Sequence, residues 1–249
     1  MTAKSTTDSE ADFLTNYDPS AYPSALLTVD LAIFTLRDGC LRLLLIKRDA
    51  HPEKGKLALP GGFVDLVRDA NLQATASRKL FEKTGVSLSH LEQVHTQGNR
   101  DRDPRGWSIT VLYMALVSDA QLEAQQTENS ADLHWRDPAA LTRSRSLAFD
   151  HRDLIKVALT RLRAKAEYTS LPLFFMPEAF TLSELQQSFE ILLGKKLEKK
   201  SFRRRILDAN VVEETGEMKR GHARPAKLYK ASTAIDAHHF SRNLEGPRS

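Results

Sequence analysis

Four charged residues at helical spacing, Arg78, Lys79, Glu82 and Lys83, form the group with the most definite chemistry in the segment 59–86. The two lysine ammonium groups can hold a diphosphate, because together they supply the positive charge that one divalent cation would bring. A magnesium ion would instead need carboxylate oxygens at short, near-octahedral distances. Glu82 alone is a poor magnesium site, and it is equally well assigned to an ion pair with Arg78, four residues earlier.

A strand, a loop and a helix must position these four residues. A short apolar strand leads into a Pro-Gly-Gly turn at 60–62, and a polar loop follows. Leu72, Ala76 and Leu80 then recur at every fourth position, which predicts a helix with one buried stripe. Gly85 follows the last apolar position and predicts the end of that helix. The charged residues lie off the buried stripe.

This loop and helix resemble the Nudix box, a motif in which glutamates hold Mg²⁺. The sequence departs from the motif at Arg68, Lys79 and Lys83, where the family has glutamates, and its loop is two residues longer. Lysine ammonium groups repel the ion and cannot ligate it while protonated. The resemblance implies an α/β/α sandwich. We therefore interpret the domain as one that binds a nucleotide diphosphate and leaves it intact, with no catalytic residue and no bound metal.

The neighbouring sequence predicts the other elements of an α/β domain. Strands are expected at 25–35, 41–47, 108–117 and 134–135, a charged loop at 97–107, and a helix at 150–165. Arg48 closes the second strand beside the box. Mixed strands with helices on both sides indicate an α/β/α sandwich. Trp107 is assigned to the core, with stacking on an adenine as the alternative.

Composition limits the class of protein. With 249 residues, 41% hydrophobic and 27% charged, the chain resembles an ordinary soluble protein of one or two domains. No apolar run approaches the ~20 residues of a membrane span, and residues 1–20 lack the apolar core of a signal peptide. Cys40 is the only cysteine and is expected to be a buried small side chain. We expect a cytoplasmic protein, and the histidine spacing predicts no zinc site.

Positive charge is concentrated near the C-terminus. The chain has a net charge of +4, and residues 195–230 hold 12 Lys and Arg against 5 Asp and Glu. That excess indicates a polyanionic partner, with a solvated helix face as the alternative. Pro172 and Pro177 mark a domain boundary ahead of this region. We expect a flexible arm at 1–20, a Nudix-like ligand-sensing domain at 21–167 and a DNA-binding domain at 168–249.

The order of elements in the last domain is helix, turn, helix and hairpin. Thr181 and Glu184 predict a capping box at the start of the first helix. The second helix is expected at 199–209, the hairpin tip at 220–225 and the returning strand at 227–230. This order is that of a C-terminal winged helix-turn-helix domain, which places its second helix in the major groove of DNA.

Seven basic residues are candidates for DNA contact, namely Lys199, Lys200, Arg203, Arg204, Arg205, Arg220 and Arg224. Arg204 lies opposite the inward-facing Phe202 and Ile206, so we expect it to reach a base edge. Lys200 and Arg224 are expected to contact phosphates. Double-stranded RNA is disfavoured because its narrow major groove excludes a helix. A winged helix used only for protein contacts is the remaining alternative.

The two domains together resemble one family, the Nudix-related transcriptional regulators of NAD metabolism called NrtR. The residues that carry the resemblance are 59–64, the degenerate box, 102–106, 149–151 and 220–226. The resemblance implies a homodimeric repressor of NAD synthesis or salvage genes, bound to a palindromic operator in double-stranded DNA and released by ADP-ribose. It also implies that Arg48, Arg78, Asp103 and Arg105 line the ADP-ribose pocket.

Hydrolysis is the competing interpretation. NrtR members with an intact box are implied to hydrolyse ADP-ribose, so a bifunctional regulator that keeps Mg²⁺-dependent ADP-ribose pyrophosphatase activity is the alternative function. We expect no required cofactor, and magnesium only if hydrolysis is retained. In the preferred interpretation, ADP-ribose favours a domain arrangement in which the two DNA-reading helices no longer have the spacing of the operator. The operator affinity then falls by the difference in ADP-ribose affinity between the two arrangements.

Overall fold

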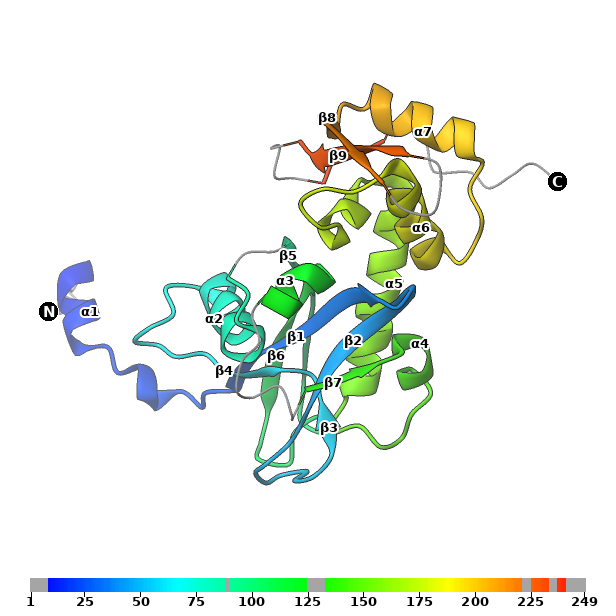
Figure 1. The fold of residues 1–249 in the computed structure, drawn as a ribbon. Coiled ribbons are helices and arrows are strands. Elements are labelled where there is room, and N and C mark those ends of the chain that lie inside the picture. The colour runs from blue at the N-terminus through cyan, green and yellow to red at the C-terminus, as the bar shows by residue number, and fades with distance from the viewer. Residues whose placement is uncertain (1–8, 88–89, 125–132, 221–224, 233–236, 241–249) are drawn as a thin grey trace, which may run out of the picture.

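The chain forms a mixed α/β domain and a smaller domain of helices and a two-stranded hairpin (Figure 1). The computed structural model describes residues 9–87, 90–124, 133–220, 225–232 and 237–240. Within this part of the chain, no helix combines the length and the apolar character needed to cross a bilayer.

One mixed sheet organises the first domain. Its strands are β1 (Leu26–Arg37), β2 (Cys40–Lys47), β3 (Leu57–Ala58), β4 (Gly61–Phe63), β5 (His90–Asn99), β6 (Ser108–Leu116) and β7 (Leu133–Arg136). The main order is β3-β2-β1-β6-β5, with β4 paired to β1 and β7 paired to β2. Strands β1 and β6 run parallel, with Asp30 opposite Leu112. This pairing brings the first strand of the domain beside a strand about 80 residues later in the chain.

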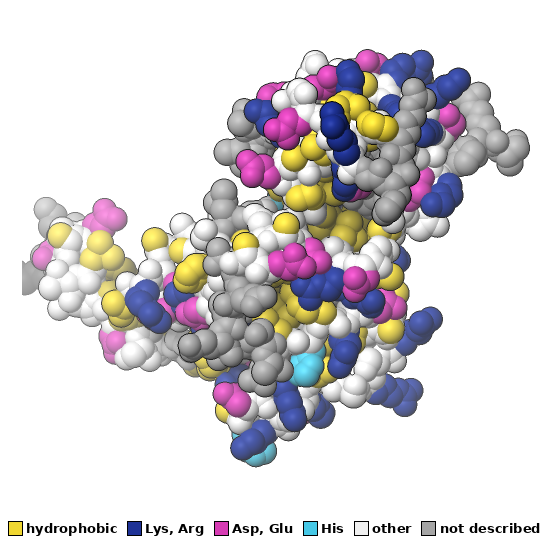
Figure 2. Space-filling view, in the orientation of Figure 1, with side chains coloured by type: hydrophobic (Ala, Val, Ile, Leu, Met, Phe, Trp, Pro, Cys, Tyr) yellow, Lys and Arg dark blue, Asp and Glu magenta, His cyan; other side chains and the backbone are white. Residues whose placement is uncertain are grey.

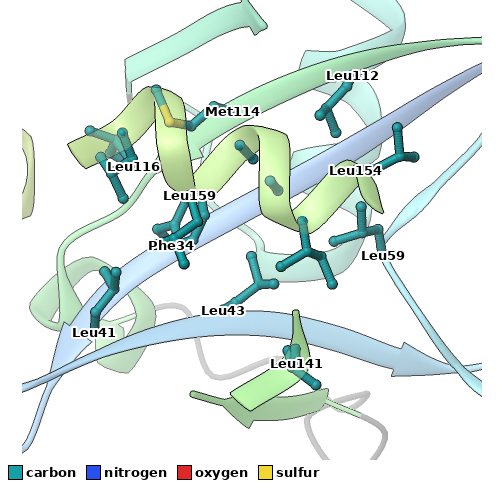
Figure 3. Packing of buried hydrophobic residues seen from close by; sticks show 14 of the residues in the cluster. Phe34, Leu41, Leu43, Leu59, Leu112, Met114, Leu116, Leu141, Leu154 and Leu159 are labelled. Carbon is teal, nitrogen blue, oxygen red and sulfur yellow. The ribbon is translucent and has the colours of Figure 1, made fainter. Parts of the chain in front are cut away.

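Helices cover both faces of the sheet, which confirms the predicted α/β/α sandwich. Helix α2 (Leu72–Thr84) packs Ala76 and Leu80 against one face. Helix α5 (His151–Tyr168) packs Leu154 and Leu159 against the other face, where the largest core cluster lies (Figure 3). The short helices α3 (Asp119–Ala124) and α4 (Pro138–Leu141) complete the domain.

The second domain has the predicted winged helix order. It contains η3 (Leu171–Phe175), α6 (Leu182–Leu193), α7 (Lys199–Asp208), β8 (Val212–Lys219) and β9 (Ala226–Ala231). The capping box of Thr181 and Glu184 is present at the start of α6. Phe202 and Ile206 of α7 are buried against α6, so the opposite face of α7 is turned outward.

The end of α5 is joined to the second domain by backbone hydrogen bonds. The Phe240 N–H donates to the Tyr168 carbonyl at 2.8 Å, and the Ser170 N–H donates to the His238 carbonyl at 2.9 Å. Thr169 and His239 form a β-bridge between them. Phe240 also belongs to the winged helix core. The last turn of α5 is therefore part of both domains.

Three sequence predictions need correction. Cys40 is exposed, because it begins β2 beside the turn at Gly39, at the end of the hairpin rather than under the sheet. Residues 97–99 of the predicted loop belong to β5, a strand that the polar sequence concealed. Trp107 is 49% exposed, which argues against a core position. Within the predicted arm, α1 (Glu10–Asn16) forms but buries none of its residues.

Candidate functional site

A cavity of about 140 Å³ opens where β1, β2 and β4 meet the start of α5. The residues that line it come from five separate segments of the first domain: Thr28, Asp30, Ile46, Arg48, Leu59, Gly61, Gly62, Phe63, Arg102, Asp103, Arg105, Phe149 and His151. Three arginines and two aspartates among them give it a strongly charged lining. Phe63 and Phe149 add two aromatic faces.

A buried network of charged groups forms the floor of the cavity. Arg102, with a side chain only 5% exposed, donates from Nε and Nη2 to both carboxylate oxygens of Asp150 at 3.0 Å. Its Nη1 donates to the Ser108 hydroxyl at 3.2 Å. Asp30 lies 3.7 Å from Arg102 and accepts a 2.7 Å hydrogen bond from Thr110. Buried charges need such partners, because unpaired they would be strongly destabilising.

His151 extends this network to the Leu59 backbone. The Leu59 N–H donates to His151 Nδ1 at 2.9 Å, so the neutral ring carries its proton on Nε2. Nε2 lies 3.8 Å from Asp30 Oδ1. Burial lowers the pKa of His151 from its usual value, although Asp30 and Asp150 oppose that shift. The imidazole is therefore neutral at pH 7. It lies between Asp30 of the cavity floor and the Leu59 backbone, and it accepts a hydrogen bond from the latter.

Two arginines lie over aromatic rings at the rim. The Arg48 guanidinium is 4.7 Å from the Phe149 ring centre, and that of Arg105 is 5.0 Å from the Phe63 ring centre. Arg105 also pairs with Asp103, with the closest contact 2.7 Å, and its hydrogen bonds lower the pKa of that carboxyl. Arg48 donates to the Pro52 carbonyl at 2.9 Å. Stacked guanidinium groups of this kind suit planar and anionic ligands.

Gly61 allows the backbone to approach the floor. A Cβ atom at this position would lie 2.4 Å from Asp30 Oδ1 and 2.5 Å from the Val29 carbonyl oxygen. No side chain fits there, because such distances are far inside van der Waals contact. The Pro-Gly-Gly turn therefore serves the close pairing of β4 with β1.

The charged residues of α2 are paired with one another beside the cavity. Arg78 donates from Nη2 and Nε to the two carboxylate oxygens of Asp69, at 2.6 and 2.8 Å, and Arg78 Nη1 reaches Glu82 at 2.9 Å. These hydrogen bonds hold the pKa of Asp69 well below its usual range. The predicted ion pair of Arg78 with Glu82 is confirmed. Arg68, by contrast, is exposed and bonds Asp65, so Asp69 is the loop residue that faces the helix.

Lys79 of α2 approaches the cavity lining at Gly62. A Cβ atom built at Gly62 would lie 3.1 Å from its Cε and 3.5 Å from its Nζ. Its ammonium group donates to Glu82 at 2.9 Å. Burial would raise the pKa of Glu82, but hydrogen bonds from Lys79 and Arg78 outweigh burial and lower it. Lys83 lies half-buried in the last turn of α2.

This donor set does not fit a magnesium ion. Glu82 accepts from two cations, and Asp69 is engaged by Arg78. The part of the chain that the structure describes contains no group of three His, Cys, Asp or Glu residues placed to hold a metal. Magnesium prefers several free carboxylate oxygens, and here those oxygens already accept hydrogen bonds from arginine and lysine.

The cavity includes part of the predicted ligand set. Arg48, Asp103 and Arg105 line it, whereas Arg78, Lys79, Glu82 and Lys83 lie on α2 outside the lining. Sequence reasoning missed Asp30, Phe63 and Phe149 as lining residues. Phe63 and Phe149 lie in the segments 59–64 and 149–151 that carry the family resemblance, and that resemblance was the signal that could have found them.

A second candidate site is the outer face of α7 (Figure 2 shows Lys and Arg side chains gathered over this part of the molecule). Lys199, Lys200 and Arg204 are exposed there. Arg203 is half-buried and donates to the Ser183 hydroxyl at 3.1 Å. The Arg205 guanidinium lies over the Phe240 ring at 6.0 Å. Three of the predicted basic residues of α7 therefore face outward, and the other two, Arg203 and Arg205, contact neighbouring residues of the domain.

The described strands of the wing, β8 and β9, carry less free positive charge than their composition suggests. Their lysines Lys219, Lys227 and Lys230 form ion pairs with Glu184, Glu214 and Glu213. Arg220 is exposed at the end of β8. Arg224, another predicted contact, lies outside the described residues. Among the described residues of this domain, the positive charge available to a partner is consequently concentrated on α7 and at Arg220.

A NUDIX domain followed by a winged helix defines the class of this protein. The family model for the NUDIX domain matches residues 26–157, and the model for the NrtR DNA-binding winged helix domain matches residues 172–231. The chain is 50% identical over 240 residues to the ADPR responsive transcriptional repressor NtrR of Acinetobacter baylyi, covering 96% of this chain and 95% of that protein. The chain belongs to the NrtR family.

Solved structures agree with this assignment. The crystal structure of Shewanella oneidensis NrtR complexed with a 27mer DNA is similar, with a TM-score of 0.82, 45% identity, and coverage of 88% of this chain and 99% of that chain. The NUDIX domain of the same protein complexed with ADP ribose matches with a TM-score of 0.56 and 45% identity, over 62% of this chain and 99% of that chain. The two candidate sites of this chain thus lie in domains that bind ADP ribose and DNA in a relative.

Proposed function

We propose that this protein is an ADP-ribose-responsive, DNA-binding transcriptional repressor of NAD synthesis or salvage genes. The observation that carries the proposal is the presence of both sites in one chain: a charged cavity in the NUDIX domain and an outward basic face on α7. Its similarity over 96% of the chain to a repressor described as ADPR responsive supports the same function.

The cavity suits ADP-ribose. Arginines at its rim and floor, Arg48, Arg102 and Arg105, can bind the diphosphate, because guanidinium groups form bidentate hydrogen bonds with phosphate oxygens. The rings of Phe63 and Phe149 line the cavity, and a planar ring of the ligand can replace the guanidinium group that lies over each. Asp30 and Asp103 offer acceptors for ribose hydroxyls. We propose that Lys79 joins this set by exchanging Glu82 for a phosphate, with Arg78 and Lys83 adding positive charge nearby.

The same geometry favours binding without hydrolysis. Metal-assisted attack on a diphosphate needs free carboxylates that hold magnesium, and Glu82 and Asp69 are engaged by Arg78 and Lys79. Incubation of the purified chain with ADP-ribose and Mg²⁺ tests this point. We expect the ADP-ribose to remain intact. Release of AMP and ribose 5-phosphate over repeated turnovers would favour the bifunctional alternative.

We propose that DNA is bound by a homodimer. A two-fold symmetric dimer presents its two α7 helices to successive major grooves roughly 34 Å apart, which matches a palindromic operator. Lys199, Lys200 and Arg204 contact the groove and its phosphates, with Arg203 and Arg205 behind them, and Arg220 and Arg224 contact the backbone from the wing. Such phosphate contacts make affinity fall steeply with salt.

One experiment tests the function as a whole. The purified chain is first used to select an operator from a random library of DNA duplexes. Fluorescence anisotropy then measures the affinity of the protein for this operator in EDTA, with and without ADP-ribose. The proposal predicts a salt-sensitive complex that ADP-ribose weakens and AMP does not. No selected duplex, or equal affinity with and without ADP-ribose, would contradict it.

A further inference from the structure

Arg102 differs from the other arginines of the cavity in its burial and its partners. Its side chain is 5% exposed, whereas that of Arg105 is 40% exposed. Arg105 can swing toward a ligand with little consequence, because its Asp103 partner belongs to the same turn. Arg102 is instead bonded to a carboxylate 48 residues away, at the start of α5. A change in the partners of Arg102 therefore alters the contacts at the start of α5.

Asp150 occupies the N-cap position of α5 but does not cap it. Its side chain makes no hydrogen bond to the amides of the first turn, and both carboxylate oxygens accept from Arg102 instead, with the Asp150 backbone at φ −92° and ψ 14° rather than extended. Aspartate is one of the preferred N-cap residues, and its usual bond is to the N–H of the second or third helical residue. The helix thus begins with its natural capping group turned toward the ligand cavity.

The backbone just before α5 is held in an uncommon conformation. Phe149 has a φ of 51°, in the left-handed region that non-glycine residues rarely adopt. Its ring faces the Arg48 guanidinium and lies 5.6 Å from the His151 ring. Strained residues of this kind persist when neighbouring contacts fix them. Here those contacts are cavity residues, so a ligand among them can alter the start of the helix.

The far end of α5 is fixed to the DNA-binding domain. The Tyr168 carbonyl accepts from Phe240, and the Phe240 ring packs against Phe189 of α6, 6.5 Å between ring centres. Arg205 of α7 lies over the same ring. Because α5 is a single helix from His151 to Tyr168, a shift of its first turn reaches the helix that presents Lys200 and Arg204.

We propose that Arg102 is the positioning residue that couples the cavity to the DNA-binding domain, by exchanging its Asp150 partner for a phosphate of the ligand. The released Asp150 carboxylate then caps α5 as the Asp150 backbone turns to the extended conformation of a capping residue, and the first turn of the helix shifts with it. This inference rests on the proposed function, since it assumes that a diphosphate enters this cavity. The ligand can shift the equilibrium only by its differential affinity for the two pairings of Arg102.

The variant Asp150→Asn tests the exchange. Asparagine removes the charge that holds Arg102 but remains a good N-cap residue, so the variant imitates the ligand-bound pairing. We expect its operator affinity without ADP-ribose to fall about tenfold, within the usual range of coupling between sites. The further effect of ADP-ribose on operator affinity should shrink, and its own affinity for the variant should be retained or increased.

Asp153→Asn is the matched control. Asp153 lies in the first turn of the same helix, is 65% exposed, and pairs with Arg152 rather than with the cavity. For Asp153→Asn, we expect the operator affinity measured by anisotropy and the ADP-ribose affinity measured by calorimetry to equal those of the natural chain. If Asp150→Asn shows the same fold-response to ADP-ribose as the natural chain, the exchange is wrong and the proposed function stands. If the natural chain does not respond, the proposed function itself fails.

A measurement on the natural chain covers the case in which Asp150→Asn does not fold. Hydrogen exchange of the amides in the first turn of α5 is followed with and without ADP-ribose. Capping by Asp150 predicts slower exchange there when ADP-ribose is bound. Unchanged exchange in the first turn, together with protection of other cavity residues, would overturn the coupling role of Arg102.

Discussion

The floor of the cavity is one buried set of contacts among four side chains, those of Asp30, Arg102, Asp150 and His151. Two of the four carry negative charge and one carries positive charge, with His151 kept neutral by burial. Removal of one member of a buried ion pair leaves an uncompensated charge, which costs several kcal/mol. A ligand phosphate that binds Arg102 must therefore replace the Asp150 carboxylate, whereas Arg48 and Arg105 at the rim can adjust to a ligand without breaking this buried network.

Gly61→Ala should destabilise the NUDIX domain by about 1–3 kcal/mol, the usual cost of overpacking. The new Cβ would meet Asp30 Oδ1 at 2.4 Å and the Val29 carbonyl at 2.5 Å. Thermal denaturation measures the loss. Gly98→Ala is the control, because its Cβ would meet only side-chain atoms, of Trp107 and Ile109, at 3.1 Å or more. Equal melting temperatures for the two variants would contradict the close packing of β4 on β1.

Glu92 should make stability depend on pH below 4.5. Burial would raise its pKa, but hydrogen bonds from His90, Lys165 and Arg161 outweigh burial and lower it from 4.5 to about 2. A depressed carboxyl pKa stabilises the folded state above the unfolded pKa, and that contribution is lost as pH falls from 4.5 toward 2.

Glu92→Gln should therefore lower stability by about 2 kcal/mol at pH 7. Denaturant titration of both proteins should show this difference shrinking as the pH is lowered toward 2. The exposed Glu167→Gln serves as the control at every pH. A difference between Glu92→Gln and the natural chain that stays constant down to pH 2 would show that charge is not the cause.

At the scale of elements, the sequence predicts what depends on neighbouring residues. Helix α2, strand β6 and the capping box of α6 follow from local spacing, and each is confirmed. Strand β5 was missed because its exposed, polar positions hide the alternation of a strand. The cavity floor could not be predicted, since its contacts join residues 80 positions apart across the parallel pairing of β1 with β6, and residues 48 positions apart between the loop before β6 and the start of α5.

Helix α7 offers a prediction about DNA reading. Arg204 points outward and should discriminate bases, whereas Arg203 is held by Ser183. Arg204→Ala should reduce the preference for the operator over a mismatched duplex by about 1–3 kcal/mol. Arg203→Ala should weaken both duplexes alike and by less. Anisotropy on matched and mismatched duplexes distinguishes the two, and an unchanged preference in Arg204→Ala would remove this residue from base reading.

At the scale of the whole molecule, the two sites are joined by one long helix. Helix α5 begins in the cavity floor and ends in hydrogen bonds to the winged helix domain. Leu171, Phe175 and Leu192 from the second domain also belong to the core of the first. This shared core couples the two domains, so that a ligand in one can select the arrangement of the other only by its differential affinity for that arrangement.

The most direct test of the account is the ADP-ribose affinity of the free and the operator-bound protein. Coupling between two binding sites is reciprocal, so the factor by which ADP-ribose weakens operator binding must equal the factor by which the operator weakens ADP-ribose binding. Calorimetric titration of ADP-ribose in EDTA, with the full chain alone and saturated with its operator, measures the second factor. The account predicts weaker binding to the complex, by the factor found for DNA. Equal ADP-ribose affinity in both titrations would contradict it.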